Sequence, residues 1–398
     1  MTENIRYDGS LKASVILKDL APFVPALSRF EEPLDLNLVF SGHGKHLDCP
    51  TLRLTNHHGL MIAGEAALSN WDAGMDMYIY GKLGNLTMTK EGINVLMTNL
   101  TGKVPPILQR LDYIRFNGEA AGYLHDLTLT GLFHTGAGMV KTDVMMSIDE
   151  QSMSRTYSGS VASADLDLGK LLNQEKKFGK VDFNVELKGF NYKNRYPESY
   201  IKGIISSFEY SQYQYENIML DGVYKDGGFN GRLSMDDANG SVQIDGNFNV
   251  AKTIPDFNLK ASVKNLRPHD LHLSDKYENA SISLGLTADF TGKSIDDMNG
   301  RISLDSLQLN APDEGGCFLD NLTITAGQVS GEKELRINSS FMTAVIRGDY
   351  SYHTIPASVV KTVQRYIPSL LTIKDNMPEP HNNFQFDICL ENAEVLSL

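Results

Sequence analysis

Histidine and cysteine side chains gather in the first sixty residues, where they could bind a metal ion. His43, His46, Cys49, His57 and His58 all carry donor atoms that zinc accepts. Structural zinc sites have recognisable ligand spacing, and these five residues match no such pattern. The polar turn of a β-hairpin accounts for the same residues. We therefore predict no metal site and no cofactor.

Two acidic segments are similar to fragments of a calcium-binding loop. Residues 236–240 are Asp-Asp-Ala-Asn-Gly, and residues 296–300 are Asp-Asp-Met-Asn-Gly. Neither segment has the alternating acidic positions or the closing glutamate of such a loop. Both stand where a hairpin turn is needed, so we interpret them as turns.

The sequence contains no catalytic motif that we can name. It has no Gly-x-Ser-x-Gly elbow, no His-Glu-x-x-His, no Walker loop and no Gly-x-Gly-x-x-Gly after a strand. Paired catalytic carboxylates depend on proximity in space, and nothing in the sequence favours them. We predict that the protein is not an enzyme and has no catalytic residues. A β-helix enzyme acting on polysaccharide is the alternative that we rank last.

The composition describes a folded, acidic protein. The chain has 398 residues, of which 41% are hydrophobic, and its net charge is −13. This hydrophobic content is enough for a sizeable core. Because phosphate contacts dominate nucleic-acid affinity, the negative charge argues against a nucleic-acid partner. The three cysteines are too few and too far apart to encode a disulfide framework.

The chain lacks the sequence signals of export and of membrane insertion. It starts with the polar Met1-Thr2-Glu3-Asn4, which has no signal-peptide character. No apolar run reaches the roughly 18 residues that a membrane span needs. Strand-like sequence begins at once, at residues 5–15, and residues 384–390 form a strand with nothing after it to pair. We expect the chain to be an interior piece of a longer protein.

Alternation of apolar and polar residues is the main secondary-structure signal. Such a period of two predicts antiparallel strands with one dry face and one wet face. The phase slips between Ile302-Leu304 and Leu307-Leu309, which indicates a β-bulge. At typical strand lengths we expect about 25–30 strands. Turn dipeptides predict hairpins at Asn117-Gly118, Asp221-Gly222, Asp226-Gly227, Asn230-Gly231, Asn239-Gly240, Asp245-Gly246 and Asn299-Gly300.

A repeated pentapeptide indicates that one β-unit is reused along the chain. Leu-Lys-Ala-Ser-Val occurs at residues 11–15 and again at residues 259–263, in each case followed by a leucine and a proline. Such reuse predicts an elongated β-structure. The whole of residues 1–398 is predicted as one repetitive region, with loose repeat units near 5–70, 71–156, 157–254 and 255–350. An amphipathic helix at 351–373 and a terminal strand segment at 374–398 complete it.

Few helices are expected. Residues 354–371 have one apolar face, with Thr354 as a possible cap and Pro356 in the first turn. Residues 21–30 are a weaker helix candidate. Residues 101–111, which contain Pro105-Pro106, are predicted as an irregular insert.

The alternating apolar residues predict an apolar groove. A sheet with one apolar face must cover that face, and a sheet that curls on itself turns the face into a trough. The predicted fold class is therefore mainly β, an elongated, curled antiparallel sheet that forms a groove. The predicted lining residues are Leu34, Leu36, Leu38, Val181, Phe183, Val185, Leu187, Leu259, Ala261, Val263, Ile282, Leu284, Leu286, Ile302 and Leu304.

An aromatic strip supports an alternative function. Phe208, Tyr210, Tyr213 and Tyr215, followed by Tyr224 and Phe229, lie close together in the sequence. Aromatic side chains bind sugars, although Tyr is also common in ordinary strands. The alternative to the groove is a β-rich cell-surface adhesin or carbohydrate-binding structural protein.

Several segments resemble the repeats of the TamB/AsmA-like family in its Bacteroidetes form. They are Val263-Lys264-Asn265-Leu266-Arg267-Pro268-His269-Asp270-Leu271-His272-Leu273, then 275–277 and 286–297, then Gly348-Asp349-Tyr350 leading into 355–358, and Asn383-Phe384-Gln385-Phe386-Asp387. The resemblance covers most of the chain.

This resemblance implies a non-enzymatic periplasmic bridge that is anchored in the inner membrane by an N-terminal helix. Its groove of aliphatic side chains would bind phospholipid acyl chains and carry lipid between the inner and outer membranes. The resemblance also implies a role in outer-membrane protein assembly, with an outer-membrane barrel as partner. Both the anchor and the barrel-binding region of the family lie outside the segments that match.

Overall fold

The computed structural model describes residues 5–20, 28–149, 151–152, 154–191, 198–275, 278–312, 315–352, 354–355, 358, 361, 365 and 382–391. The chain forms two compact units, Met1–Val223 and Tyr224–Leu398, which are described separately below. Strand β13 (Tyr213–Lys225) crosses the boundary between the two units.

The first unit consists of strands with short helical inserts. The strands are β1 (Arg6–Ile16), β2 (Pro33–His43), β3 (His46–Thr55), β4 (Leu60–Ser69), β5 (Tyr78–Thr89), β6 (Tyr113–Tyr123), β7 (Asp126–Thr135), β8 (Gly138–Ile148), β9 (Arg155–Ala164), β10 (Leu166–Asp167), β11 (Phe178–Asn191) and β12 (Glu198–Tyr210). The inserts are η1 (Leu17–Leu20), η3 (Gly74–Asp76), α1 (Lys90–Thr101), α2 (Pro106–Gln109) and α3 (Leu168–Leu172).

The second unit contains nine strands within its described residues. They are β14 (Gly228–Asp237), β15 (Gly240–Asn249), β16 (Asp256–Leu266), β17 (Ser281–Thr291), β18 (Asn299–Ala311), β19 (Gly315–Val329), β20 (Glu332–Ser339), β21 (Met342–Asp349) and β22 (Asn383–Leu390). A single 3-10 turn, η4 (Ile295–Asp297), connects β17 to β18.

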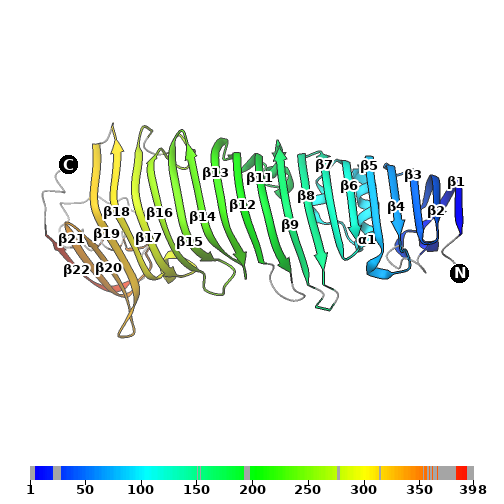
Figure 1. Cartoon of the computed structure of the whole chain (residues 1–398). Coiled ribbons are helices and arrows are strands. Elements are labelled where there is room, and N and C mark those ends of the chain that lie inside the picture. Colours follow the sequence, from blue (N-terminus) through cyan, green and yellow to red (C-terminus); the bar gives the residue numbers. More distant parts are fainter. Residues whose placement is uncertain are drawn as a thin grey trace. The chain divides into compact units, whose positions relative to one another are not determined.

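Strand order in each unit follows the chain. In the first unit every full-length strand from β1 to β12 pairs antiparallel with the next, and β11 pairs with both β9 and β12. The second unit has the same pattern from β14 to β22. Figure 1 shows the strands of each unit side by side in this order. The predicted fold class, a mainly β antiparallel sheet with few short helices, is confirmed.

Bulges interrupt the pairing and bend the sheet. The predicted slip between Leu304 and Leu307 is confirmed, because the register between β17 and β18 shifts there and Ser306 has a φ of 51°. In the first unit, register shifts recur in four successive strand pairs, from β2–β3 to β5–β6. A bulge kinks its strand and increases the local twist, so these shifts curve the sheet.

In five of the seven predicted hairpin dipeptides, both residues lie in strands instead. Gly118, Gly222, Gly231, Gly246 and Gly300 are strand residues. Only the remaining two dipeptides, at 226–227 and 239–240, lie at turns between strands. The prediction was wrong because glycine is also used within strands, where another backbone approaches closely.

The expected number of strands was also too high. Within the described residues there are 22 strands, most of them 8–15 residues long. The estimate assumed the common length of about 5–6 residues. Each strand here is roughly twice that length, so fewer strands account for the same chain.

Helix α1 was not predicted. The side chain of Thr89 accepts a hydrogen bond from the Gly92 amide at 3.2 Å, and Gly102 ends the helix with a φ of 78°. A threonine cap and a closing glycine are ordinary helix signals, and they were present in the sequence.

Of the predicted helix at 354–371, the structure describes Ile355, Ser358, Lys361 and Arg365 as helical, and most of its other positions lie outside the described residues. Most of the candidate at 21–30 lies outside them too.

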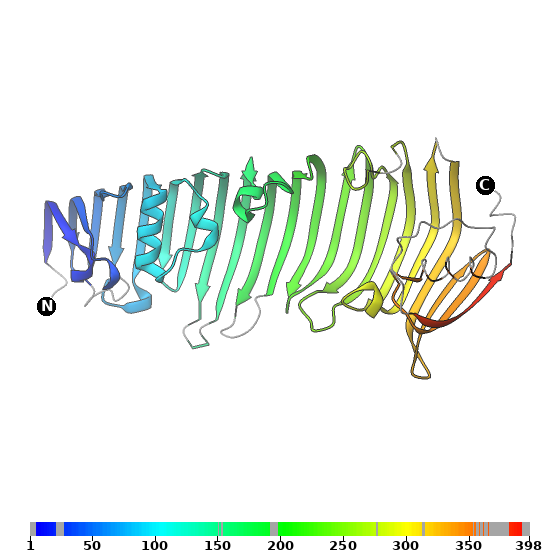
Figure 2. The ribbon, with the colours of Figure 1, turned by 180° about the vertical axis from the view of Figure 1, so that it is seen from behind.

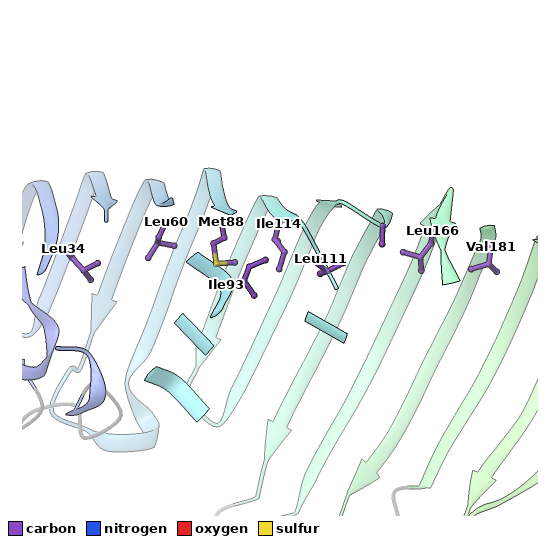
Figure 3. Close-up of a cluster of buried hydrophobic side chains, with 9 residues drawn as sticks. Leu34, Leu60, Met88, Ile93, Leu111, Ile114, Leu166 and Val181 are labelled. Carbon is purple, nitrogen blue, oxygen red and sulfur yellow. The ribbon is translucent and has the colours of Figure 1, made fainter. Parts of the chain in front are cut away.

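The main core of the first unit lies beneath the inserts, near one end of the strands. Figure 3 shows its side chains in a line across successive strands. The cluster consists of Leu34, Leu60, Met88, Ile93, Leu111, Ile114, Ala137, Leu166 and Val181. Ile93 of α1 is 1% exposed within it. Figure 2 shows α1 against this face of the sheet, running roughly along the strands.

Candidate functional site

One face of the first unit carries a row of mostly aliphatic residues and glycines from β3 to β12. Residues that pair directly across successive strands form a cross-strand row, and all members of a row share a face. One such row runs Leu52, Gly64, Leu83, Gly118, Gly131, Thr142, Val161, Val185 and Gly203. We call the face that carries this row the apolar face.

The opposite face of the first unit is charged. The adjacent row runs Glu65, Lys82, Glu119, Thr130, Asp143, Ser160, Glu186 and Lys202. We call this the polar face. Because the two rows belong to the same strands, the alternation seen in the sequence separates apolar and charged side chains across a single sheet.

The second unit repeats this separation. Its apolar face carries the row Leu233, Ile244, Ala261, Leu286, Leu304 and Leu322. Its polar face carries the row Arg232, Asp245, Lys260, Thr287, Ser303, Thr323 and Asn338. Each unit therefore presents its own apolar surface.

The seven lining residues predicted in the first unit all lie on its apolar face, in two groups. Leu34, Leu36 and Leu38 of β2 pair with residues of β1, and Val181, Phe183, Val185 and Leu187 of β11 pair with residues of β12. Strands β3 to β9 separate the groups. Leu34 and Val181 are buried in the core cluster, whereas the other five are half-buried.

The eight lining residues predicted in the second unit lie on adjacent strands and are brought together. Leu259 pairs with Ala288, which pairs with Ile302; Ala261 pairs with Leu286, which pairs with Leu304. Val263 pairs with Leu284, and Ile282 follows on the same face of β17. All eight side chains are half-buried, so they remain partly accessible.

Sequence reasoning missed the apolar residues of β5 to β9. Leu83, Leu129, Val144 and Val161 lie on the apolar face between the two predicted groups. Glycines and bulges interrupt the alternation in these strands and hide the pattern. The run Leu127-Thr128-Leu129 was the signal that could have found them.

Glycines allow neighbouring strands to approach closely on the apolar face. Gly159 has a φ of +142°, and a Cβ there would lie 2.0 Å from the carbonyl oxygen of Asp143. Gly246 in the second unit has a φ of +149°, and its Cβ would lie 2.3 Å from the carbonyl oxygen of Asn258. Such kinks are a known means of curving a sheet.

Ion pairs and a hydrogen bond of His58 connect the start of α1 to the turn before β4. His58, in the turn before β4, lies between two carboxylates: its Nδ1 is 2.8 Å from Glu91 Oε1 of α1, and its Nε2 is 3.3 Å from Glu32 Oε2. The Thr89 hydroxyl also donates to the His58 carbonyl at 2.7 Å. The hydrogen bond to Glu91 and the charge of Glu32 raise the pKa of His58 above its ordinary value.

The five histidine and cysteine residues do not form one site. His46 is the first residue of β3, and His57 and His58 come after its last residue. At about 3.3 Å per residue, the two ends of β3 are roughly 30 Å apart. His46 contacts Ser69 Oγ at 2.7 Å and Asp48 Oδ2 at 2.9 Å. Within the described residues no group of three or more His, Cys, Asp or Glu side chains is arranged to hold a metal ion.

In each of the two acidic segments, an aspartate carboxylate accepts a hydrogen bond from a backbone amide. The Asp237 carboxylate accepts from the Asn239 amide at 2.9 Å in the turn after β14. The Asp296 carboxylate accepts from the Ser351 hydroxyl at 2.8 Å and from the Tyr352 amide at 2.5 Å. Both therefore act as structural hydrogen-bond acceptors.

A cavity of about 730 Å³ is lined by residues of strands β3 to β7. Its lining includes residues of the apolar row, such as Leu83 and Gly118, and of the adjacent polar row, such as Glu65, Lys82 and Glu119. Lys82 Nζ is 3.8 Å from Glu65 Oε1. Sequence reasoning did not predict this cavity.

The aromatic strip is a packed cluster. Tyr213 and Tyr215 meet edge to face with centroids 4.8 Å apart, and Phe208 and Tyr210 stack at 6.3 Å. Phe178 of β11 contacts both Phe208 and Tyr210. Tyr215 is 8% exposed. These four residues of the strip pack on one another, which leaves little flat ring surface for a sugar.

Two further observations bear on identity. No helix among the described residues has both the length and the apolar character needed to cross a bilayer. Comparison of the chain with protein-family models, with curated proteins and with solved structures finds no match in any of the three.

Proposed function

We propose that the chain binds phospholipid acyl chains along its apolar faces and acts as a non-enzymatic bridge for lipid transport. The observation that carries this proposal is the apolar row of each unit. Its side chains lie on one face of a single-layer sheet and are mostly half-buried. An ordinary domain covers such a face with a second layer. Among the described residues, the inserts of the first unit pack on the core cluster, and the second unit has only η4 between its strands β17 and β18.

The chemistry of these faces suits a hydrocarbon chain. Burial of acyl carbons contributes about 0.8 kcal/mol per CH₂, so a lipid tail of ordinary length would be held appreciably. The row of the second unit consists of Leu, Ile and Ala, and the row of the first unit combines Leu and Val with glycines and Thr142. Because no position is much more favourable than the next, a bound chain can move along the face.

The resemblance to the TamB/AsmA-like family extends this proposal. On that resemblance we propose that the protein acts in the periplasm, anchored to the inner membrane, where it would carry phospholipid to the outer membrane or assist assembly of outer-membrane proteins. An outer-membrane barrel is the proposed protein partner. These assignments rest on the resemblance of the sequence segments alone.

Lipid binding can be tested on protein purified from cells. Native mass spectrometry should show co-purifying phospholipid. A photoreactive residue at Leu284, on the apolar face of β17, should crosslink to lipid. The same residue at Ser283, on the polar face of β17, should not. A clean apo mass together with no crosslink at Leu284 would refute the proposal.

The adhesin alternative receives less support. It relied on the aromatic strip, whose rings pack on one another and on Phe178. Glycan binding that is lost when Tyr213 and Tyr215 are both replaced by alanine would favour it over the lipid bridge.

A further inference from the structure

His58 has a carboxylate opposite each of its two ring nitrogens. Its Nδ1 lies 2.8 Å from Glu91 Oε1, and its Nε2 lies 3.3 Å from Glu32 Oε2. A neutral imidazole carries a single N–H, so it can donate to only one of these two acceptors. The imidazolium carries two N–H groups and can serve both. The arrangement of the three side chains therefore fits His58 in its charged form.

The contact with Glu32 is the one that depends on the second proton. The Glu32 Oε2 atom is buried and has no hydrogen-bond partner among the described residues. A neutral ring that keeps its proton on Nδ1, hydrogen-bonded to Glu91, would turn the lone pair of Nε2 toward this buried oxygen. A buried carboxylate oxygen that faces no donor is unfavourable. Loss of the proton should therefore displace Glu32 from His58.

The charges around the ring give the direction of this change with pH. The hydrogen bond to Glu91, together with the charges of Glu32 and Glu91, raises the pKa of His58, against the opposing effect of burial. Lys90 of α1 acts on Asp112. The contact between His58 and Glu32 is therefore complete at low pH and is lost as the pH rises through the raised pKa.

Glu32 belongs to a short segment that lies beside α1. We call this segment, residues 29–32, the strap. The guanidinium of Arg29 lies next to Gly102, the residue that ends α1, because a Cβ at Gly102 would be 2.8 Å from Arg29 Nη1. At its other end the strap meets His58, which is hydrogen-bonded to the first turn of α1. The strap therefore contacts both ends of the helix region, directly at one end and through His58 at the other.

Helix α1 in turn packs on the apolar face of the first unit. Ile93 is 1% exposed and lies in the core cluster with Leu60, Met88 and Ile114 (Figure 3). These three residues pair directly across β4, β5 and β6. Leu60 is four residues from Gly64 of the apolar row, so it shares the face of that row. A loosened α1 would uncover the row Leu60, Met88 and Ile114.

We propose that protonated His58 holds the strap against α1, and that loss of this proton releases the strap and opens the row Leu60, Met88 and Ile114 to an acyl chain. The opening to an acyl chain rests on the proposed lipid binding, whereas the release of the strap does not. Lipid uptake by the first unit would then increase with pH. The second unit does not contain His58, so its lipid binding would not follow the same titration.

The first test measures the titration of His58 by NMR of protein labelled at histidine, with His58→Gln to identify its signal. Glu32→Gln removes one charge at nearly constant size and should lower the pKa of His58. Glu31→Gln makes the same change in charge one residue away, where the carboxylate pairs with Lys18 at 2.5 Å, and should leave that pKa unchanged. Equal values in the two variants would overturn the proposal.

The second test follows lipid contact beneath α1. Protein containing photo-methionine is mixed with vesicles of phosphatidylethanolamine and phosphatidylglycerol and illuminated at about pH 5.5 and about pH 8.5, on either side of an ordinary histidine titration. Lipid crosslinks at Met88 should increase at the higher pH in the wild type and in Glu31→Gln. Glu32→Gln should lose this dependence on pH. Met235, on the apolar face of the second unit, is the internal control and should crosslink equally at both pH values.

The outcomes separate the strap from lipid binding itself. An increase at Met88 that persists in Glu32→Gln, or one that Met235 shares, would overturn the proposal. Crosslinks at neither methionine at either pH would count against lipid binding. Hydrogen exchange of the α1 amides, which needs no lipid, then decides on the strap: the loss of protection at high pH should be present in Glu31→Gln and absent in Glu32→Gln. Circular dichroism checks that each variant is folded.

Discussion

Replacing one kinked glycine tests the backbone geometry that curves the apolar face. Gly81 and Gly159 belong to the same cross-strand row, which runs Gly81, Ala120, Leu129, Val144 and Gly159. A Cβ at Gly81 would meet nothing within 4 Å. A Cβ at Gly159 would lie 2.0 Å from the Asp143 carbonyl oxygen and 2.7 Å from the Val144 Cα, at a φ of +142°.

The two alanine variants should therefore change stability in opposite directions. At Gly159 an L-residue in a sparsely populated backbone region costs about 1–3 kcal/mol, and the clash with the backbone of β8 adds about 1–3 kcal/mol. Gly159→Ala should destabilise the protein by about 2–5 kcal/mol in total. Gly81 has a negative φ, so Gly81→Ala should stabilise by about 0.4–1 kcal/mol through the unfolded chain.

Urea unfolding followed by circular dichroism measures both changes as shifts in the midpoint. The expected order of midpoints is Gly81→Ala, then wild type, then Gly159→Ala. If the two variants unfold at the same urea concentration, the strand at Gly159 is ordinary extended backbone. The account of how the apolar face is curved would then be refuted.

Three further outcomes follow from the site. Ile93→Ala should lower the free energy of unfolding, measured in urea, by about 2–5 kcal/mol, because this side chain of α1 is 1% exposed, whereas Ile107→Ala at 48% exposure should cost little. His58 has a raised pKa, so the stability that it contributes is complete below its unfolded pKa near 6.5 and is lost as pH rises through the raised value. Hydrogen exchange of the α1 amides should accordingly speed up above neutral pH beyond the intrinsic rate, and His58→Gln should abolish that excess. Val185→Lys on the apolar face should reduce co-purifying phospholipid in native mass spectra, and Glu186→Lys on the polar face should leave it unchanged.

Alternation predicted the faces of the strands well because the side-chain period of a strand is fixed. The pattern around Leu36, Val185 and Leu286 assigned each residue to a face, and the observed register agrees. The bulge after Leu304 was visible for the same reason, since an extra residue inverts the phase. These are local properties of the chain.

The remaining features depend on contacts that a single sequence does not show. Asn117-Gly118 was predicted as a turn, but Gly118 lies inside β6 because its partner strand comes too close for a side chain, with the Thr130 carbonyl oxygen 2.3 Å from a Cβ placed there. The burial of Leu34 and Val181 depends on inserts that fold over them from elsewhere in the chain. Helix α1 is a different case, since its cap at Thr89 was present and was overlooked.

The sequential pairing of strands has a consequence for folding. Within each unit nearly every strand contacts only its predecessor and its successor, so the mean sequence separation of contacting residues is low for a β-protein. Sheets of this kind avoid the long loop closures that slow most β-proteins, and they can grow from any formed hairpin outward. Stability then resembles a sum over neighbouring strands, in which the terminal hairpins fray first. A unit built this way can gain or lose a hairpin without rearranging the others.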